Sequence, residues 1–220
     1  VQAPQPSPFA TLEQKVGLTD VTVEYSRPNM KGRTIYGNLV PYDKLWRTAA
    51  NKNTIVSFSD DVVIDGQTIK AGKYALFTKP GANNWEVYFY TDTENWGTPQ
   101  QWDDSKVAAK TTVATNAFPV SVESFTIMIN NLSNSGASLD ILWENTHVAI
   151  PFSVPTDAKV SASIDKVMAG PAGDDYFAAA VYYLEEGKDI NKAVTWIDKA
   201  VELTKDQPRF WYLRQQSLIH

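Results

Sequence analysis

Cysteine is absent from the 220-residue sequence, and histidine occurs only twice, as His147 and His220. The lack of cysteine excludes disulfides, thiolate zinc sites and cysteine nucleophiles together. A histidine-based triad would have to use His147. If Glu144 and His147 lie on one strand, they fall on opposite faces, so they are not expected to work as a base and its orienting partner.

An excess of positive charge is also missing, since 20 Lys and Arg face 25 Asp and Glu, a net charge of −5 at pH 7. Nucleic acid is therefore not an expected partner. No apolar run is long enough to cross a bilayer, so no transmembrane segment is expected. The sequence also has no glycine-rich phosphate loop, nucleophile elbow or calcium-loop spacing. We expect no cofactor and no metal.

The sequence is 43% hydrophobic and 12% aromatic, enough for a substantial core. Alternating apolar positions over 10–16 and 21–25 predict a hairpin of half-buried strands. Further strands are expected at 54–58, 62–64, 67–69, 73–78, 85–90, 106–118, 122–130, 138–143 and 147–154. Pro151 suggests that the last of these is an edge strand. Short strands at this spacing predict an antiparallel β-sandwich or barrel-like domain.

The composition changes after Pro155, and the apolar residues over 160–168 have helical spacing. Asp174 is a candidate N-cap for a helix over 176–186, Asp189 for the helix after it, and Pro208 opens a last helix. We expect a C-terminal helical hairpin plus one more helix, similar to a tetratricopeptide repeat. One such unit cannot bury its own apolar face. It should therefore dock on the β domain or on a partner. Trp196 and Trp211 are the candidate docking side chains, although their helical spacing favours packing in the core of the helices.

Three segments follow from these patterns: a flexible leader (1–8), a β-sandwich domain (9–155) and a helical tail (156–220). The leader begins without methionine and is polar and proline-rich, as expected of a chain whose signal peptide was removed. A trimmed chain would look the same. We expect a periplasmic or outer-membrane-associated protein.

The long connection over 24–51 places three arginines among aromatic side chains. Arginine forks suit carboxylates and phosphates, and Tyr and Trp offer flat faces. The same donors can instead satisfy the backbone carbonyls of a loop. The alternation that ends at Pro28 predicts a structural role for Arg27, with Arg33 and Trp46 toward a ligand. The candidate residues for a small anionic or sugar ligand are Tyr25, Arg27, Arg33, Trp46, Arg47 and Trp96.

Trp96 belongs to an acidic loop over 91–105 and is also expected to cap one end of the sheet. The motifs Tyr25-Ser26-Arg27-Pro28, Lys31-Gly32-Arg33, Leu45-Trp46-Arg47-Thr48-Ala49-Ala50-Asn51 and Asn95-Trp96-Gly97 occur in this order. With them the chain resembles the secreted bacterial domain-of-unknown-function family 2911 over nearly all of 7–154. The resemblance implies export and a β-rich domain, and no established activity. Ala49 stands where glycine is more often expected.

Three functions remain open at this point. The first is an exported, non-catalytic binding or scaffold protein of the bacterial cell envelope, with the loop over 24–51 as its ligand site. The second is a structural subunit of an outer-membrane assembly that docks through the helices over 174–220. The third is a hydrolase that uses Glu24 or Glu144, although nothing in the sequence brings these carboxylates together.

Overall fold

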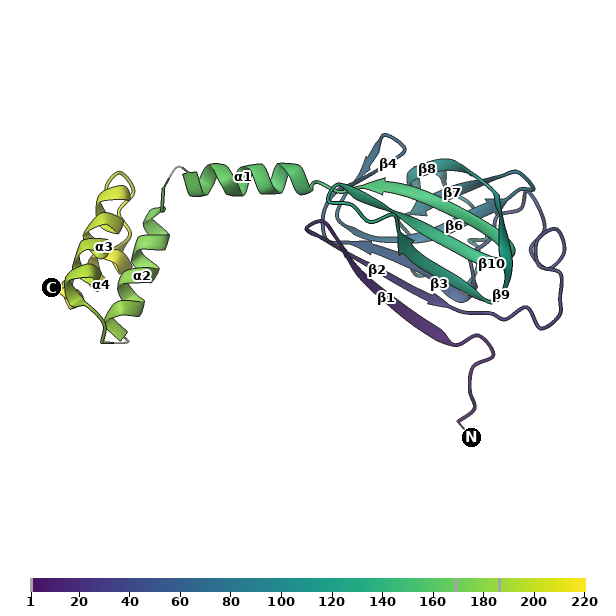
Figure 1. Cartoon of the computed structure of the whole chain (residues 1–220), viewed down its shortest axis with the longest axis horizontal. Helices are drawn as coiled ribbons and strands as arrows, with labels where there is room; N and C mark the ends of the chain where they lie inside the picture. Colours follow the sequence, from purple (N-terminus) through teal and green to yellow (C-terminus); the bar gives the residue numbers. More distant parts are fainter. Residues whose placement is uncertain (1, 169, 186) are drawn as a thin grey trace. The chain divides into compact units, whose positions relative to one another are not determined.

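The computed structural model describes residues 2–168, 170–185 and 187–220, and Figure 1 traces its elements along the chain. The chain divides into two compact units, Val1–Lys159 and Val160–His220. The first unit holds two antiparallel sheets and the second is helical. The expected fold class, a mainly β chain with a C-terminal helical tail, is confirmed.

The larger sheet has six strands in the order β1-β2-β3-β6-β7-β8. They are β1 (Phe9–Val16), β2 (Thr19–Ser26), β3 (Ala50–Phe58), β6 (Gly72–Pro80), β7 (Asn84–Tyr90) and β8 (Val107–Ala114). The predicted first hairpin is present, paired from Phe9 with Ser26 to Val16 with Thr19. Its turn needs Gly17, because the residue has φ +56 and a Cβ there would lie 2.4 Å from the carbonyl oxygen of Asn134.

The smaller sheet has four strands in the order β5-β4-β10-β9. They are β4 (Val62–Ile64), β5 (Gln67–Ile69), β9 (Asn116–Asn130) and β10 (Gly136–Ser153). The single strand predicted over 106–118 was wrong, because Thr115 separates β8 from β9 and the two strands belong to different sheets. The hairpin turn between β4 and β5 lies at Asp65 and Gly66, as the sequence predicts.

The two strands predicted over 138–143 and 147–154 are one strand, β10. A bulge hides their continuity from the alternation pattern, because the register with β9 shifts on both sides of Glu144, which has φ +55. The edge position predicted from Pro151 was also wrong, since β10 lies between β4 and β9. Its register with β9 ends at His147, so Pro151 lies beyond that ladder.

The main core fills the space between the two sheets, with Trp85, Phe125 and Trp143 among its largest fully buried side chains. A second, smaller cluster lies around Ile55, Phe77 and Tyr90. These residues alternate with core residues along their strands, so the cluster covers the opposite face of the six-stranded sheet. The loop over 91–105 contributes Trp102 to this cluster and ends in the short helix η1 (Asp104–Lys106).

The helices are α1 (Thr156–Met168), α2 (Gly173–Glu185), α3 (Ile190–Leu203) and α4 (Phe210–Ile219). Asp189 caps α3 as predicted, by accepting a hydrogen bond from the Asn191 amide at 3.0 Å. The prediction of Asp174 as an N-cap was wrong. Asp174 lies inside the first turn of α2, and its carboxylate accepts hydrogen bonds from Tyr212 and Arg209. Glu186, the predicted last residue of that helix, lies outside the described residues.

Small and apolar side chains hold the helical unit together, with Ala180, Ala193 and Ile197 fully buried. Trp196 packs against Tyr183 with ring centroids 4.6 Å apart, while Trp211 is 45% exposed. Docking of these helices elsewhere and their kinship with tetratricopeptide repeats stay predictions. None of the helices in the described ranges has both the length and the apolar character needed to cross a membrane.

Candidate functional site

The connection between β2 and β3, residues 27–49, lies against the bulge of β10. The amides of Ile35 and Tyr36 both lie 3.4 Å from carboxylate oxygens of Glu144, one on each. Ile35 and Tyr36 are buried, and burial, followed by the nearby charge of Glu144, raises the pKa of Tyr36. The left-handed bulge residue therefore anchors the middle of the connection by presenting its carboxylate to two backbone donors.

Trp46 is fixed by both its backbone and its ring. Its amide donates to the carbonyl of Thr78 at 2.8 Å and its carbonyl accepts from the Thr78 amide at 3.0 Å, so this residue adds a bridge to β6. Its indole stacks on that of Trp143, with centroids 6.2 Å apart and an interplanar angle of 13°. The indole remains partly exposed and belongs to the wall of a pocket.

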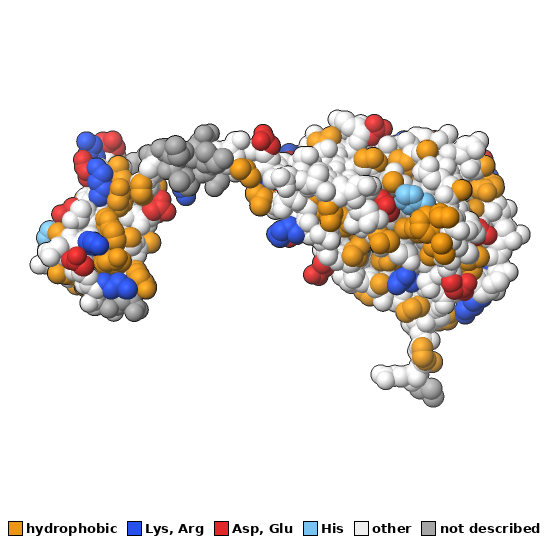
Figure 2. Space-filling model, viewed as in Figure 1, with side chains coloured by type: hydrophobic (Ala, Val, Ile, Leu, Met, Phe, Trp, Pro, Cys, Tyr) orange, Lys and Arg blue, Asp and Glu red, His pale blue; other side chains and the backbone are white. Residues whose placement is uncertain are grey.

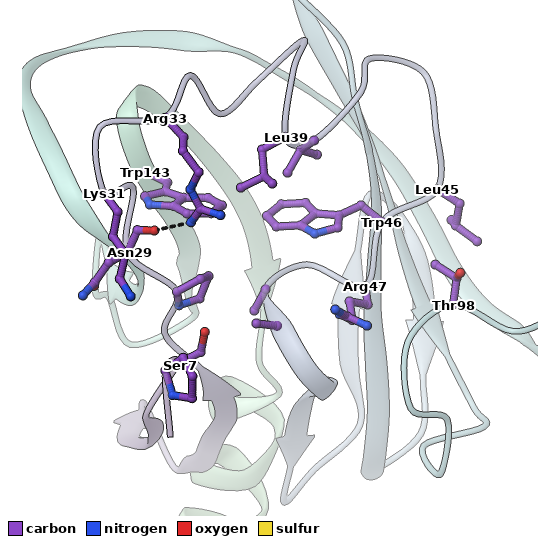
Figure 3. A pocket seen from close by; sticks show the side chains of 15 residues that line it. Ser7, Asn29, Lys31, Arg33, Leu39, Leu45, Trp46, Arg47, Thr98 and Trp143 are labelled. Atoms are coloured by element: carbon purple, nitrogen blue, oxygen red, sulfur yellow. Dashed lines mark hydrogen bonds between the residues drawn. The ribbon is translucent and has the colours of Figure 1, made fainter. Parts of the chain in front are cut away.

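This pocket has a volume of about 530 Å³, within the usual range for small-molecule sites. We call it the arginine pocket. Figure 3 shows Trp46 at its centre, with Arg33 and Lys31 on one side and Arg47 on the other. Its lining residues are Pro6, Ser7, Pro28, Asn29, Lys31, Arg33, Leu39, Val40, Leu45, Trp46, Arg47, Ala49, Ala50, Thr98 and Trp143. Three of these described lining residues are cationic, and none of them is Asp or Glu.

Arg33 is exposed and holds the turn that precedes it. Its Nε donates to the carbonyl of Met30 at 2.8 Å and its Nη2 to that of Asn29 at 2.6 Å. A guanidinium carries five N–H donors, so three remain for another partner. Arg33 therefore does both things that the sequence left open, since it satisfies backbone carbonyls and lines the pocket.

Arg47 is half-buried and makes no hydrogen bond or ion pair with any residue in the described ranges. Its Nη1 would lie only 3.1 Å from a Cβ placed on Gly97, which has φ +100. Glycine at this position lets the backbone of the loop approach the guanidinium closely. The Asn95-Trp96-Gly97 motif thus meets the arginine motif in space through Gly97.

Trp96 itself does not line the pocket and is 74% exposed. The prediction that it caps one end of the sheet was wrong. The tryptophan from this loop that covers the sheet is Trp102, which stacks on Tyr90 with centroids 4.5 Å apart. Both tryptophans lie in the same polar loop, so local sequence gave no basis for choosing between them.

Arg27 and Tyr25 lie away from the pocket and join the two sheets. The Tyr25 hydroxyl accepts from the Ile127 amide at 3.1 Å and lies 3.3 Å from the Ile127 carbonyl. Arg27 donates through Nε to the Phe125 carbonyl at 3.0 Å and through Nη2 to the Thr126 hydroxyl at 2.7 Å. Of the six candidate site residues, the structure brings Arg33, Trp46 and Arg47 together at the pocket and leaves Tyr25, Arg27 and Trp96 outside it.

Several lining residues were not among the candidates. Lys31 was visible in the Lys31-Gly32-Arg33 motif, and its amide donates to a carboxylate oxygen of Glu123 at 2.9 Å. Trp143 comes from β10, and nothing in the sequence indicated that it would lie near the connection over 24–51. Ser7 belongs to the predicted flexible leader, yet its carbonyl accepts from Nδ2 of Asn51 at 3.2 Å. The end of the leader is therefore held against the domain and forms part of the pocket.

The wall of the pocket at the start of β3 has an unusual backbone. Thr48, Ala49 and Asn51 have φ of +54, +143 and +61. Such conformations are strained for residues other than glycine, and they persist where surrounding contacts impose them. The Thr54 hydroxyl donates to the Thr48 carbonyl at 2.5 Å and is one such contact. The positive φ of Ala49 gives a physical reason for expecting glycine at this position.

The carboxylates considered for hydrolysis do not share a site. Glu24 lies on β2, 4.0 Å from Nζ of Lys73, whereas Glu144 binds the amides of the connection. His147 lies 3.1 Å from a carboxylate oxygen of the buried Asp140 rather than next to Glu144. No cluster of three or more metal-ligating side chains occurs in the part of the chain that the structure describes.

A family described as "Protein of unknown function (DUF2911)" matches residues 7–152. The match covers most of the chain and every residue of the arginine pocket except Pro6, so the chain belongs to this family. No curated protein and no solved structure matches the chain.

Proposed function

We propose that this member of the DUF2911 family is a binding protein that takes up a small anionic ligand in the arginine pocket. One observation carries the proposal: Lys31, Arg33 and Arg47 line one pocket that has no acidic side chain among its described lining residues, in a chain whose net charge is −5. Like charges that share one pocket repel each other, and their combined field attracts an anion.

Arg47 supports the proposal most directly. A half-buried guanidinium with no described partner has lost part of its hydration without receiving acceptors in exchange. A carboxylate or phosphate would provide two acceptor oxygens that match its fork. The open donors of Arg33 and the ammonium of Lys31 would meet the same ligand from the other side of Trp46 (Figure 3).

The remaining lining suggests the shape of the ligand. Trp46, Leu39 and Leu45 offer apolar surface beside the cations. A flat or ring-shaped ligand that carries a carboxylate or phosphate, such as an acidic sugar or an aromatic acid, fits this combination. Among the described residues, the lining has the hydroxyls of Ser7 and Thr98 but no Asp, Glu, His or Cys to activate them or to act as a base, which favours binding over hydrolysis.

We place this function in the bacterial cell envelope, in keeping with the export that the family resemblance implies. Fractionation of cells that produce the protein from its native gene tests the location. Recovery of the protein in the cytoplasmic fraction would contradict it.

Isothermal titration of the full chain at low salt tests the ligand class, with D-glucuronate, benzoate and inorganic phosphate as probes. We expect at least one probe to bind, and Arg47→Ala to weaken it by about tenfold to a hundredfold, the usual effect of a charged hydrogen bond. Arg214→Ala, a change in α4, is the matched control and should bind as the wild type does. Absence of binding by all three anions, or equal binding by Arg47→Ala, would refute the proposal.

A second candidate is docking to a protein of the envelope through the helical unit. Figure 2 shows apolar side chains exposed among charged ones on this unit, and Phe210 and Leu218 are 73% and 58% exposed. Exposed large apolar side chains are typical of protein interfaces when they form a patch, and the rings of Phe210 and the exposed Trp211 have centroids 5.2 Å apart. Cross-linking in intact cells should give an adduct with the wild type that the double variant Phe210→Ser, Leu218→Ser loses. An unchanged adduct would exclude this face.

A further inference from the structure

The cations of the arginine pocket form two groups rather than one. Figure 3 shows Arg33 and Lys31 on one side of Trp46 and Arg47 on the other. The indole lies between the two groups and offers them a shared apolar wall. The arrangement of the cations therefore bears on how many anionic groups the ligand carries.

The fold attaches the two groups to different sheets. Asn29 forms a bridge to β9 shortly before Lys31, and Trp46 forms a bridge to β6 directly before Arg47. β9 belongs to the four-stranded sheet and β6 to the six-stranded sheet. The positions of the two groups are thus set by separate backbone contacts, and one small anionic group does not draw them together.

The two groups differ in burial and therefore in strength. Arg47 is half-buried and has no described partner, so an anion gains most there. Arg33 is exposed and gives two of its donors to backbone carbonyls, which leaves three of about five free. In Lys31 it is the backbone amide that donates to Glu123, so the ammonium group is not used in that contact. Water screens exposed cations, and this group should contribute less than Arg47.

The space between the groups suits a ring. Trp46 presents an aromatic face there, and offset or edge contacts with such a face favour flat ligands. The pocket volume of about 530 Å³ accepts a six-membered ring with a substituent at each end. A ligand with a single charge would occupy one group of cations and leave the other without an anion.

Resting on the proposed function, we infer that the ligand class of this pocket is a doubly charged ring with an anionic group at each end. The first carboxylate or phosphate binds Arg47, and the second meets Arg33 and Lys31 across Trp46. The field of the whole chain does not produce this preference, because a net charge of −5 repels a dianion more than a monoanion. The preference arises from the two groups of cations in the pocket.

Isothermal titration of the full chain at low salt tests the inference with three probes: terephthalate, its monomethyl ester and phthalate. Terephthalate should bind about tenfold more tightly than the ester, whereas its two equivalent carboxylates alone account for only about twofold. Phthalate carries the same charge on adjacent carbons and cannot reach both groups. It should therefore lack most of this gain, which separates geometry from charge alone.

The double variant Lys31→Ala, Arg33→Ala tests which residues receive the second anionic group. It should bind the monomethyl ester within about twofold of the wild type, which also shows that it is folded, and should lose the preference for terephthalate. Lys44→Ala is the matched control, because Lys44 is an exposed cation of the same connection that does not line the pocket. This control should keep the preference.

The outcomes separate this inference from the proposed function. If none of the three probes binds, both fail. If the ester binds within about twofold of terephthalate, or phthalate gains as much as terephthalate, the pocket takes anions but not doubly charged rings. A preference that the double variant retains would likewise overturn the inference and leave the proposed anion site intact. The comparison of probes on the wild type needs no variant, so it stands even where a variant does not fold.

Discussion

Replacing Arg27 with alanine should destabilise the β domain far more than replacing Arg33. β9 is an edge strand, and the Phe125 amide donates to the Pro28 carbonyl at 2.8 Å, so the Phe125 carbonyl also faces outward from the sheet, away from β10. Arg27 supplies the missing donor through Nε at 3.0 Å. Because Phe125 is fully buried, water cannot readily replace that donor when the side chain is removed.

The magnitude follows from the two hydrogen bonds of each arginine. Arg27→Ala leaves a buried carbonyl unpaired and removes the bond to the Thr126 hydroxyl, for a loss of about 2–3 kcal/mol in the free energy of unfolding. Arg33 also binds two carbonyls, those of Met30 and Asn29, but it is exposed and water can take its place. Arg33→Ala should cost within about 0.5 kcal/mol.

Thermal and urea unfolding of the two variants, followed by near-ultraviolet circular dichroism, measure the difference. For a chain of this size the expected loss for Arg27→Ala corresponds to roughly 4–12 °C in melting temperature. Thr126→Val removes one of the two acceptors, and the double variant completes a cycle whose coupling isolates the contact between Arg27 and Thr126. A larger loss for Arg33→Ala than for Arg27→Ala would show that Arg33 fixes the connection and would reverse the two roles.

Three further predictions concern the backbone, an ion pair and the end of the β domain. Ala49→Gly should raise the free energy of unfolding by up to about 1 kcal/mol, because relief of strain at φ +143 outweighs the added chain entropy; a lower melting temperature would contradict this. Hydrogen bonding from Lys159, supported by Thr19 and Ser59, lowers the pKa of the Asp60 carboxyl against the opposing effect of burial. Because the folded-state pKa lies below the unfolded value of about 3.9, this contribution to stability is present above that pH and is lost as the pH falls through the folded-state pKa. Asp60→Asn should therefore flatten stability-versus-pH curves below about pH 4, and an unchanged acid limb would refute the pairing. A fragment ending at residue 155 should have a lower melting temperature than one ending at residue 160. The shorter fragment lacks the Thr156 hydroxyl, which lies 3.3 Å from the Leu18 amide, and it lacks the ion pair of Lys159 with Asp60. Equal melting temperatures would show that the first turn of α1 is dispensable.

The local patterns that depend on neighbouring residues could be read from the sequence. The alternation of Val21, Val23 and Tyr25 predicted β2 and its inward face, and Asp65-Gly66 predicted the turn between β4 and β5. These features follow from the two-residue period of a strand and from the conformational freedom of glycine, both of which act over short distances. The ordered motifs also indicated the family to which the chain belongs.

The sites depended on contacts between distant segments. Trp143 enters the arginine pocket because Glu144 forms a bulge, and Gly97 approaches Arg47 from a different loop. Asn53 directly precedes the strand predicted over 54–58, yet beside a register shift against β2 its side-chain amide is buried without a hydrogen-bond partner among the described residues. Residue types and spacing along one segment indicate which side chains face inward. Which of them meet, and which polar atoms remain unpaired, is decided only when the two sheets pack and their bulges shift the register.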